Sequence, residues 1–181
     1  MLEFSMEILL SEQQIQKGIE RIAFDINQAY LEWPDVIICT LSGATPFFSD
    51  LIKHLTFDFE VDFIKATTYS ANGVTQKTTI RGPFSIDVEN KSIMIIEDIA
   101  DSGKTLQAIM QHFQQYGCKS VEVISLLKRK SFVNNLLFDN RPVSLQHCFE
   151  VDEGWLVGYG LDDNQKKRNL KNIYVKREGV N

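Results

Sequence analysis

The sequence predicts a single α/β domain built on an open, mostly parallel sheet, and three apolar segments carry this prediction. Val36–Cys39 and Ile93–Ile96 are continuous apolar runs, as expected of short strands buried on both faces of a sheet. Val121–Leu127 alternates before it becomes wholly apolar. Each segment is followed by a polar turn, which is the arrangement of open α/β sheets. The 181 residues are enough for one domain with a sizeable core.

The composition is that of a globular protein. Apolar residues make up 44% of the chain, and no apolar run approaches the roughly 18 residues that a membrane helix needs. The formal net charge of −5 argues against general nucleic-acid binding. No secretory leader pattern opens the chain, so we expect a cytoplasmic location. Cys39, Cys118 and Cys148 lack CxxC spacing, so reduced core thiols are expected rather than disulfides or metal ligands.

The amino-terminal part predicts a helix, a buried strand and a second helix. Ser11 is a suitable N-cap, and apolar residues recur at helical spacing to about residue 30. Pro34 interrupts this pattern before the strand Val36–Cys39. That strand ends at the turn Leu41-Ser42-Gly43-Ala44, after which Pro46 suits the first turn of a helix.

The rest of the chain predicts further strands and one more helix. Thr78–Ile86 is expected to pair with Val61–Thr68 across a polar turn. A helical pattern follows the central strand and ends near Gly117, a residue typical of helix C-termini. The elements expected after the central strand are a helix over Leu106–Phe113 and strands over Val121–Leu127, Val143–Val151 and Asn172–Val175.

The stretch Ile93–Leu106 carries the clearest signs of a functional site. Its apolar strand runs directly into the acids Glu97, Asp98 and Asp101. The small and hydroxylated residues of Ser102–Thr105 then leave backbone N–H groups free where a helix should begin. Open α/β sheets present phosphorylated sugars in this way, at the carboxyl ends of their strands. The stretch therefore predicts a sugar-phosphate site.

Two other interpretations of this stretch compete with the first. Gly103-Lys104-Thr105 matches the end of the P-loop motif GxxxxGK[ST], but the first glycine of that motif would fall at Asp98. Hydrolysis of a nucleoside triphosphate is therefore not favoured. Acids that merely cap a helix are common after a buried strand. Three acids within five residues, beside a glycine-lysine turn, exceed what capping requires.

The segment IIEDIADSGKT resembles the phosphoribosyl pyrophosphate signature of type I phosphoribosyltransferases. LSGATPF from Leu41, TTYS from Thr67, WLVGYGLDD from Trp155 and the following RNL sharpen the resemblance to the hypoxanthine-guanine branch. The family fold is an open, mostly parallel twisted sheet flanked by helices, with a small hood formed by the chain ends. The resemblance thus implies one domain over residues 1–181, with a core at about 33–142 and a hood from about 1–30 and 143–181.

The resemblance implies a pyrophosphate side formed by Leu41-Ser42-Gly43 and Arg168. Family members often hold a non-proline cis peptide just before this glycine. Many have a lysine where this chain has Ser42, so only backbone contacts carry over at that position. Thr68 and Tyr69 correspond to a serine-tyrosine pair on a mobile loop, whose closure would exclude water from the reaction. An ordinary turn and a plain hairpin tip are the structural alternatives for these two segments.

The purine side is implied by residues further along the chain. Alignment on the paired leucines of the third strand puts Arg129 where the family has a lysine that donates to the purine 6-oxo group. A shift of one residue would put Lys128 or Lys130 there instead. Trp155 is expected to stack on the purine, and the backbone of Leu156 to meet its exocyclic edge.

The catalytic acids follow from the same resemblance. Glu97, Asp98 and Asp162 are the expected Mg²⁺-linked acids, and Mg²⁺ prefers oxygen ligands and substrate phosphates. Glu97 and Asp98 would also hold the ribose hydroxyls, although adjacent strand residues point to opposite faces. Asp101 would take the proton from purine N7 as N9 attacks ribose C1. The residues expected to bind the 5′-phosphate are Ser102, Gly103, Lys104 and Thr105.

The implied activity is purine salvage, in which hypoxanthine or guanine and phosphoribosyl pyrophosphate give IMP or GMP and pyrophosphate. Transfer to xanthine or adenine is an alternative, although a basic cluster at 128–130 favours 6-oxopurines. A regulator that binds phosphoribosyl pyrophosphate without catalysis is another, and it need not retain Asp101, Tyr69 or Asp162. The expected partners are small molecules and further copies of the chain in a dimer or tetramer, without nucleic acid or membrane.

Overall fold

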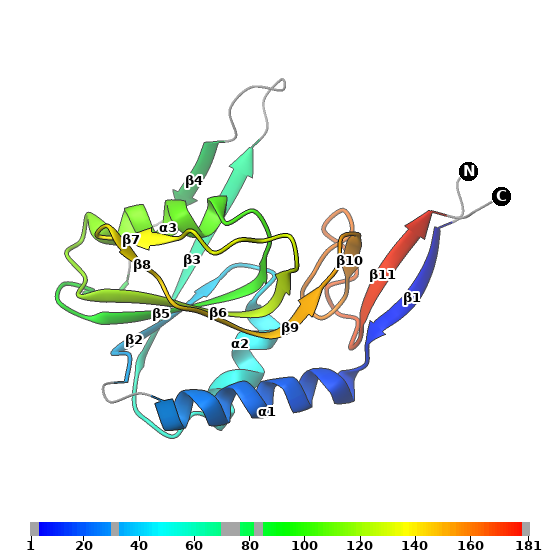
Figure 1. The fold of residues 1–181 in the computed structure, drawn as a ribbon, viewed down its shortest axis with the longest axis horizontal. Helices are drawn as coiled ribbons and strands as arrows, with labels where there is room; N and C mark the ends of the chain where they lie inside the picture. Colours follow the sequence, from blue (N-terminus) through cyan, green and yellow to red (C-terminus); the bar gives the residue numbers. More distant parts are fainter. Residues whose placement is uncertain (1–3, 30–32, 70–76, 82–84, 179–181) are drawn as a thin grey trace.

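The computed structural model describes residues 4–29, 33–69, 77–81 and 85–178, and a twisted sheet lies at the centre of this part (Figure 1). The strand order is β4-β3-β2-β5-β6-β9. All neighbours pair in parallel except β3 and β4, which are antiparallel at one edge. The predicted α/β fold is therefore confirmed. The strands are β2 Val36–Thr40, β3 Glu60–Tyr69, β4 Lys77–Arg81, β5 Ser92–Ala100, β6 Ser120–Arg129 and β9 Leu145–Val151.

Helices cover both faces of this sheet. Helices α1 (Glu12–Ala29) and α2 (Thr45–Leu51), with the short 3-10 helix η1 (Ile52–His54), lie on one face, and α3 (Lys104–Gln114) lies on the other (Figure 1). Alternate strand residues contribute to two separate hydrophobic clusters, one on each face. This arrangement explains the continuous apolar runs, because both sides of β2 and β5 face helices.

A second, smaller sheet extends from one end of the molecule and includes the first and the last strand of the described chain (Figure 1). It consists of β1 (Phe4–Leu10), β11 (Ile173–Glu178) and β10 (Trp155–Val157), all antiparallel. We call these three strands the hood. A short hairpin of β7 (Leu137–Phe138) and β8 (Arg141–Pro142) lies apart from both sheets.

Helix α1 and strand β9 pack with the main sheet. Strand β9 pairs with β6 in the main sheet, and α1 packs on that sheet with Ile15 and Ile19 fully buried. Gly18 of α1 lies directly against the ring of Phe149 on β9. Residues 12–29 and 145–151 thus belong to the core by packing. The hood keeps only the outermost segments, including β1, a strand that the sequence reasoning did not predict.

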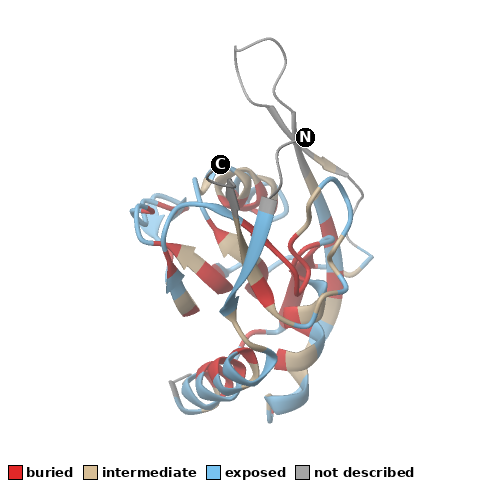
Figure 2. Cartoon of the chain, turned by 90° about the vertical axis from the view of Figure 1, so that its right-hand side faces the viewer, coloured by how far each residue is buried: buried red, intermediate tan, exposed pale blue. Residues whose placement is uncertain are grey.

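The burial pattern in Figure 2 places the buried residues between the helices and the main sheet. Strands β2, β5 and β6 run parallel, so their carboxyl ends meet at one edge, where α2 and α3 also begin. No helix in the described ranges combines the length and the apolar character that a membrane crossing requires.

Candidate active site

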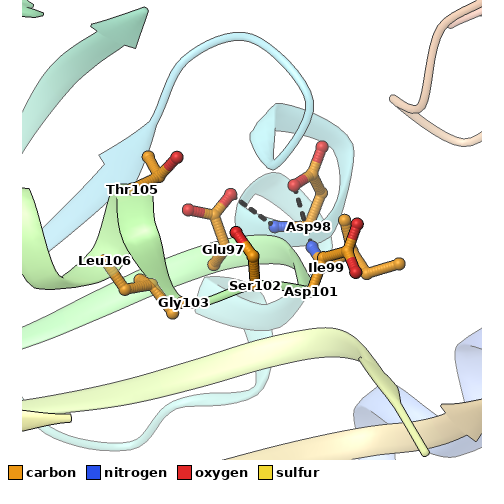
Figure 3. A pocket seen from close by; sticks show the side chains of 8 residues that line it. All are labelled: Glu97, Asp98, Ile99, Asp101, Ser102, Gly103, Thr105 and Leu106. Carbon is orange, nitrogen blue, oxygen red and sulfur yellow. Dashed lines mark hydrogen bonds between the residues drawn. The ribbon is translucent and has the colours of Figure 1, made fainter. Parts of the chain in front are cut away.

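Three pockets meet at this edge of the sheet, and Asp98 borders each of them. The central pocket, of about 250 Å³, follows the end of β5 and the start of α3 (Figure 3). The β2-side pocket measures about 210 Å³ and the β6-side pocket about 270 Å³. The central pocket is bordered by Glu97, Asp98, Ile99, Asp101, Ser102, Gly103, Thr105 and Leu106.

Glu97 is a buried acid held by two hydrogen bonds. The hydroxyl of Thr40 donates to its Oε1 atom at 2.8 Å, and the backbone N–H of Asp98 donates to the same atom at 3.1 Å. Burial, together with the neighbouring Asp98 carboxyl, raises the pKa of Glu97 well above its usual range. Thr40 was not anticipated as a site residue, although a polar side chain at the end of an apolar strand was the available signal.

Asp98 points toward the turn that follows β2. Its Oδ1 atom accepts a hydrogen bond from the backbone N–H of Ile99 at 2.8 Å (Figure 3). A Cβ atom at Gly43 would overlap the Asp98 carboxylate, so the turn passes directly over this acid. Glu97 and Asp98 both border the central pocket although they are adjacent on β5, a strand that continues to Ala100.

The Ser102–Thr105 turn begins helix α3 in the predicted way. Gly103 is the N-cap residue and has a left-handed conformation with φ of 72°, which glycine adopts without steric cost. Side chains of Phe132 and Leu136 pack close to it. Ser102, Gly103 and Thr105 border the central pocket, whereas the exposed Lys104 does not.

The β2-side pocket contains the turn Leu41-Ser42-Gly43. The peptide bond between Leu41 and Ser42 is cis. It precedes the bond that joins Ser42 to Gly43. Arg168 and Asp162 border the same pocket and form an ion pair, with Nη2 of the arginine 2.8 Å from Oδ1 of the aspartate. Residues that are far apart in the sequence thus meet on this side.

The β6-side pocket gathers the predicted purine residues. Arg129, Trp155, Leu156, Asp101 and Asp162 all border it. The terminal nitrogens of Arg129 donate to the carbonyl oxygens of the turn before β10, to Asp152 through Nη1 and to Gly154 through Nη2, the latter at 2.7 Å. Its Nε atom is buried without a hydrogen-bond partner among the described residues and lies 3.9 Å from Oδ1 of Asp101.

The two lysines beside Arg129 are engaged elsewhere. Lys128 pairs with Glu150 at 2.6 Å, and Lys130 pairs with Asp152 at 2.9 Å. Neither borders the β6-side pocket. Of the three cations between which the sequence could not choose, Arg129 is therefore the one that the fold brings to this pocket.

Two expected features lie partly or wholly outside the described residues. The backbones of Thr68 and Tyr69 end strand β3, opposite Thr78 and Lys77 of β4, but their side chains are not described. The loop that would close over the site, residues 70–76, lies outside the described ranges, as do residues 82–84 of the predicted strand Thr78–Ile86.

The acids suit a magnesium ion that brings its own phosphate ligands. Within the described residues no three His, Cys, Asp or Glu side chains cluster into a complete metal site. Asp98 and Asp162 nevertheless border both the β2-side and the β6-side pockets. Mg²⁺ usually takes one or two protein carboxylates, together with substrate phosphates and waters, so this donor set fits the ion.

Comparison with known proteins agrees with this geometry. Residues 5–164 match the family model of the phosphoribosyl transferase domain. The chain is 31% identical to a hypoxanthine-guanine-xanthine phosphoribosyltransferase of Tritrichomonas foetus, over 99% of this chain and 96% of that protein. It is 33% identical to a Bacillus subtilis hypoxanthine-guanine phosphoribosyltransferase, over 96% and 94%. A solved Bacillus anthracis hypoxanthine-guanine phosphoribosyltransferase superposes with a TM-score of 0.81 at 28% identity, covering 97% of this chain and 99% of that one.

Proposed function

The chain belongs to the phosphoribosyl transferase domain family, and on this premise we propose that it is a purine salvage enzyme. It transfers the phosphoribosyl group of phosphoribosyl pyrophosphate to hypoxanthine or guanine and forms IMP or GMP and pyrophosphate. The observation that carries this proposal is the position of Asp98 and Asp101 on β5 and its following turn, between the β2-side pocket and the β6-side pocket.

Each of the three pockets binds a different part of the substrates. The sugar phosphate occupies the central pocket, with its 5′-phosphate on the backbone N–H groups and hydroxyls of the Ser102–Thr105 turn. Pyrophosphate occupies the β2-side pocket, beside Leu41-Ser42-Gly43 and Arg168, whose guanidinium matches phosphate oxygens. The purine occupies the β6-side pocket, stacked on Trp155, which is 58% exposed and available for stacking.

Charge development explains the placement of the acids. Cleavage of the bond between ribose C1 and pyrophosphate builds positive charge on the sugar and negative charge on the leaving group. Glu97 and Asp98 orient the ribose hydroxyls, and Asp101 takes the N7 proton of the purine as N9 attacks C1. Asp101 is 62% exposed in its side chain and borders both the central and the β6-side pockets, so it can reach the purine.

We propose Mg²⁺ as the cofactor, held by Asp162 and Asp98 with Glu97 beside them. Bound there with pyrophosphate, the ion would neutralise the charge of the leaving group. The ion pair between Asp162 and Arg168 supports this assignment, because it places the two side chains next to each other. A phosphate group bound to Mg²⁺ would offer the metal ion to the aspartate and its oxygens to the arginine.

The arrangement of the whole chain supports further proposals. Core and hood form one domain, and the hood residues Trp155 and Leu156 complete the site. We propose Thr68 and Tyr69, at the end of β3, as the lid pair. The enzyme is a homodimer or homotetramer, for which the exposed Phe24 of α1 offers an apolar contact. A cytoplasmic location suits the free thiols of its three cysteines.

The test is a spectrophotometric assay with phosphoribosyl pyrophosphate, Mg²⁺ and one purine at a time. Hypoxanthine and guanine are expected to give IMP and GMP. Xanthine is the second candidate substrate, because the Tritrichomonas foetus relative is named for it as well. Adenine is expected to give no product. Absence of product from every purine, with phosphoribosyl pyrophosphate still bound in calorimetry, would contradict the proposal and favour a non-catalytic regulator.

A further inference from the structure

A buried tyrosine in the turn after β10 reaches across to helix α2. Tyr159 is 7% exposed, and its hydroxyl donates to Oδ2 of Asp50 at 2.7 Å. The amide of Gln16 on α1 donates to the same oxygen at 3.0 Å, and Lys53 pairs with Oδ1 at 2.8 Å. Neither Tyr159 nor Asp50 borders any of the three pockets of the site.

The backbone beside Tyr159 lies directly on the turn that follows β2. A Cβ atom at Gly160 would overlap the carbonyl oxygen of Gly43 and approach Pro46 to 3.0 Å. Gly160 also exchanges hydrogen bonds with Arg168, whose Nη1 atom donates to the Gly160 carbonyl at 2.7 Å. Tyr159 is therefore adjacent to Gly160, which contacts both the Leu41-Ser42-Gly43 turn and Arg168 of the β2-side pocket.

The conformation of this turn needs an anchor. Gly158, Tyr159 and Gly160 all have positive φ angles, of 97°, 48° and 98°. A non-glycine residue rarely adopts such a conformation, and here the tyrosine does so between two glycines. The hydrogen bond to Asp50 fixes the side chain of this residue on α2, the helix that begins immediately after the Leu41-Ser42-Gly43 turn.

In this pair the Tyr159 hydroxyl is the neutral donor and the Asp50 carboxylate is the charged acceptor. Burial, with the hydrogen bond to Asp50, raises the pKa of the Tyr159 hydroxyl well above its usual value. At Asp50 burial acts in the upward direction, but hydrogen bonds from Lys53, Tyr159 and Gln16 outweigh it and lower the pKa. The contact is therefore a charge-assisted hydrogen bond at neutral pH.

We propose that Tyr159 and Asp50 are positioning residues for the pyrophosphate group. Their hydrogen bond holds the 158–160 turn against the Leu41-Ser42-Gly43 turn, and this contact sets the spacing between Arg168 and the backbone groups on the other side of the β2-side pocket. The proposal rests on the proposed function, since it assigns the pyrophosphate to that pocket. Purine binding is independent of the contact, because Trp155 and Arg129 are held by other hydrogen bonds.

The test removes the hydroxyl and follows the two substrates separately. Tyr159→Phe is expected to raise the KM for phosphoribosyl pyrophosphate by about tenfold, since a hydrogen bond to a charged group is lost, and to leave the KM for hypoxanthine within about twofold. Tyr174→Phe is the matched control. Its hydroxyl accepts a hydrogen bond from Asn172 at 3.1 Å, and neither residue borders the β2-side pocket, so neither KM should change.

A double-mutant cycle adds the second residue. Asp50→Asn is expected to raise the same KM, and the double variant to be no worse than the more affected single variant, because both remove one contact. A lower melting temperature with an unchanged KM for phosphoribosyl pyrophosphate, or an equal rise in both KM values, would overturn the proposal. The Kd for pyrophosphate can be measured by calorimetry without turnover. It therefore tests the role of the Tyr159–Asp50 contact even if the wild-type chain makes no product from any purine.

Discussion

The Nε atom of Arg129 lies 3.9 Å from Oδ1 of Asp101, while the other end of the same guanidinium holds the backbone carbonyls of Asp152 and Gly154. One buried side chain therefore contacts both the proposed proton acceptor and the turn that precedes Trp155. Arg129 therefore links the proposed proton acceptor to the turn that precedes the proposed purine contact.

Asp101→Asn should lower kcat by about 10²–10⁴-fold, the usual contribution of a general base. The KM for phosphoribosyl pyrophosphate should stay within about twofold, because the proposal assigns the ribose and phosphate groups to other residues. Steady-state kinetics with hypoxanthine measures both values. Asp139→Asn, which changes an exposed acid outside the three pockets, serves as the control. Unchanged turnover in Asp101→Asn would exclude the assigned role.

Arg129→Gln should loosen the turn before β10 and raise the KM for hypoxanthine, because two carbonyl groups lose their charged donor. Arg129→Lys should have a smaller effect, since a lysine keeps the charge but lacks the planar fork. Trp155 emission in a Trp33→Phe background reports the state of the turn, as the chain has two tryptophans.

Lys130→Gln is the control for these arginine variants, because it removes only the exposed ion pair with Asp152. Its kinetics and emission should match those of the parent. Equal effects of Lys130→Gln and Arg129→Gln would mean that the KM for hypoxanthine depends on general positive charge and not on the hydrogen bonds from Arg129 to the two carbonyls.

Gly43→Ala should raise the KM for phosphoribosyl pyrophosphate by at least about tenfold. The new methyl group would overlap the Asp98 carboxylate, and relief of such overpacking typically costs about 1–3 kcal/mol. Ser42→Ala, one residue earlier, removes an exposed side chain and should change the KM little, because only backbone groups are assigned there. Similar KM values for the two variants would contradict the close approach of this turn to Asp98.

Asp50 should contribute to stability in a pH-dependent way. Its pKa in the folded state is lowered, so its stabilisation is complete well above the unfolded value of about 4 and is lost as pH falls through the folded value. The stability difference between wild type and Asp50→Asn should thus be largest at neutral pH and should shrink below about pH 4. Urea unfolding at several pH values measures it, with Asp58→Asn as an exposed control. A difference that is constant with pH would exclude this role of the carboxylate.

Much of the core could be predicted because its signals are local. The apolar runs of β2 and β5 and the helix after Gly103 follow from residues within one element, and the structure confirms them. The strand β1 could not be predicted in this way. Its pairing with β11 joins the two ends of the chain, and Met6 and Ile8 within it are exposed, so no buried face marks it.

The sequence by itself determined the family and the residue types of the site, because the acids and the phosphate-sized turn of 97–105 are contiguous and depend on one strand and one helix start. Only the tertiary structure decided that Arg129, not Lys128 or Lys130, borders the β6-side pocket, and that Tyr159 reaches Asp50. Each of these outcomes depends on which way a side chain points at the meeting of segments more than twenty residues apart. Such contacts are chosen by packing and by competition between hydrogen-bond partners, and neither is encoded in local sequence.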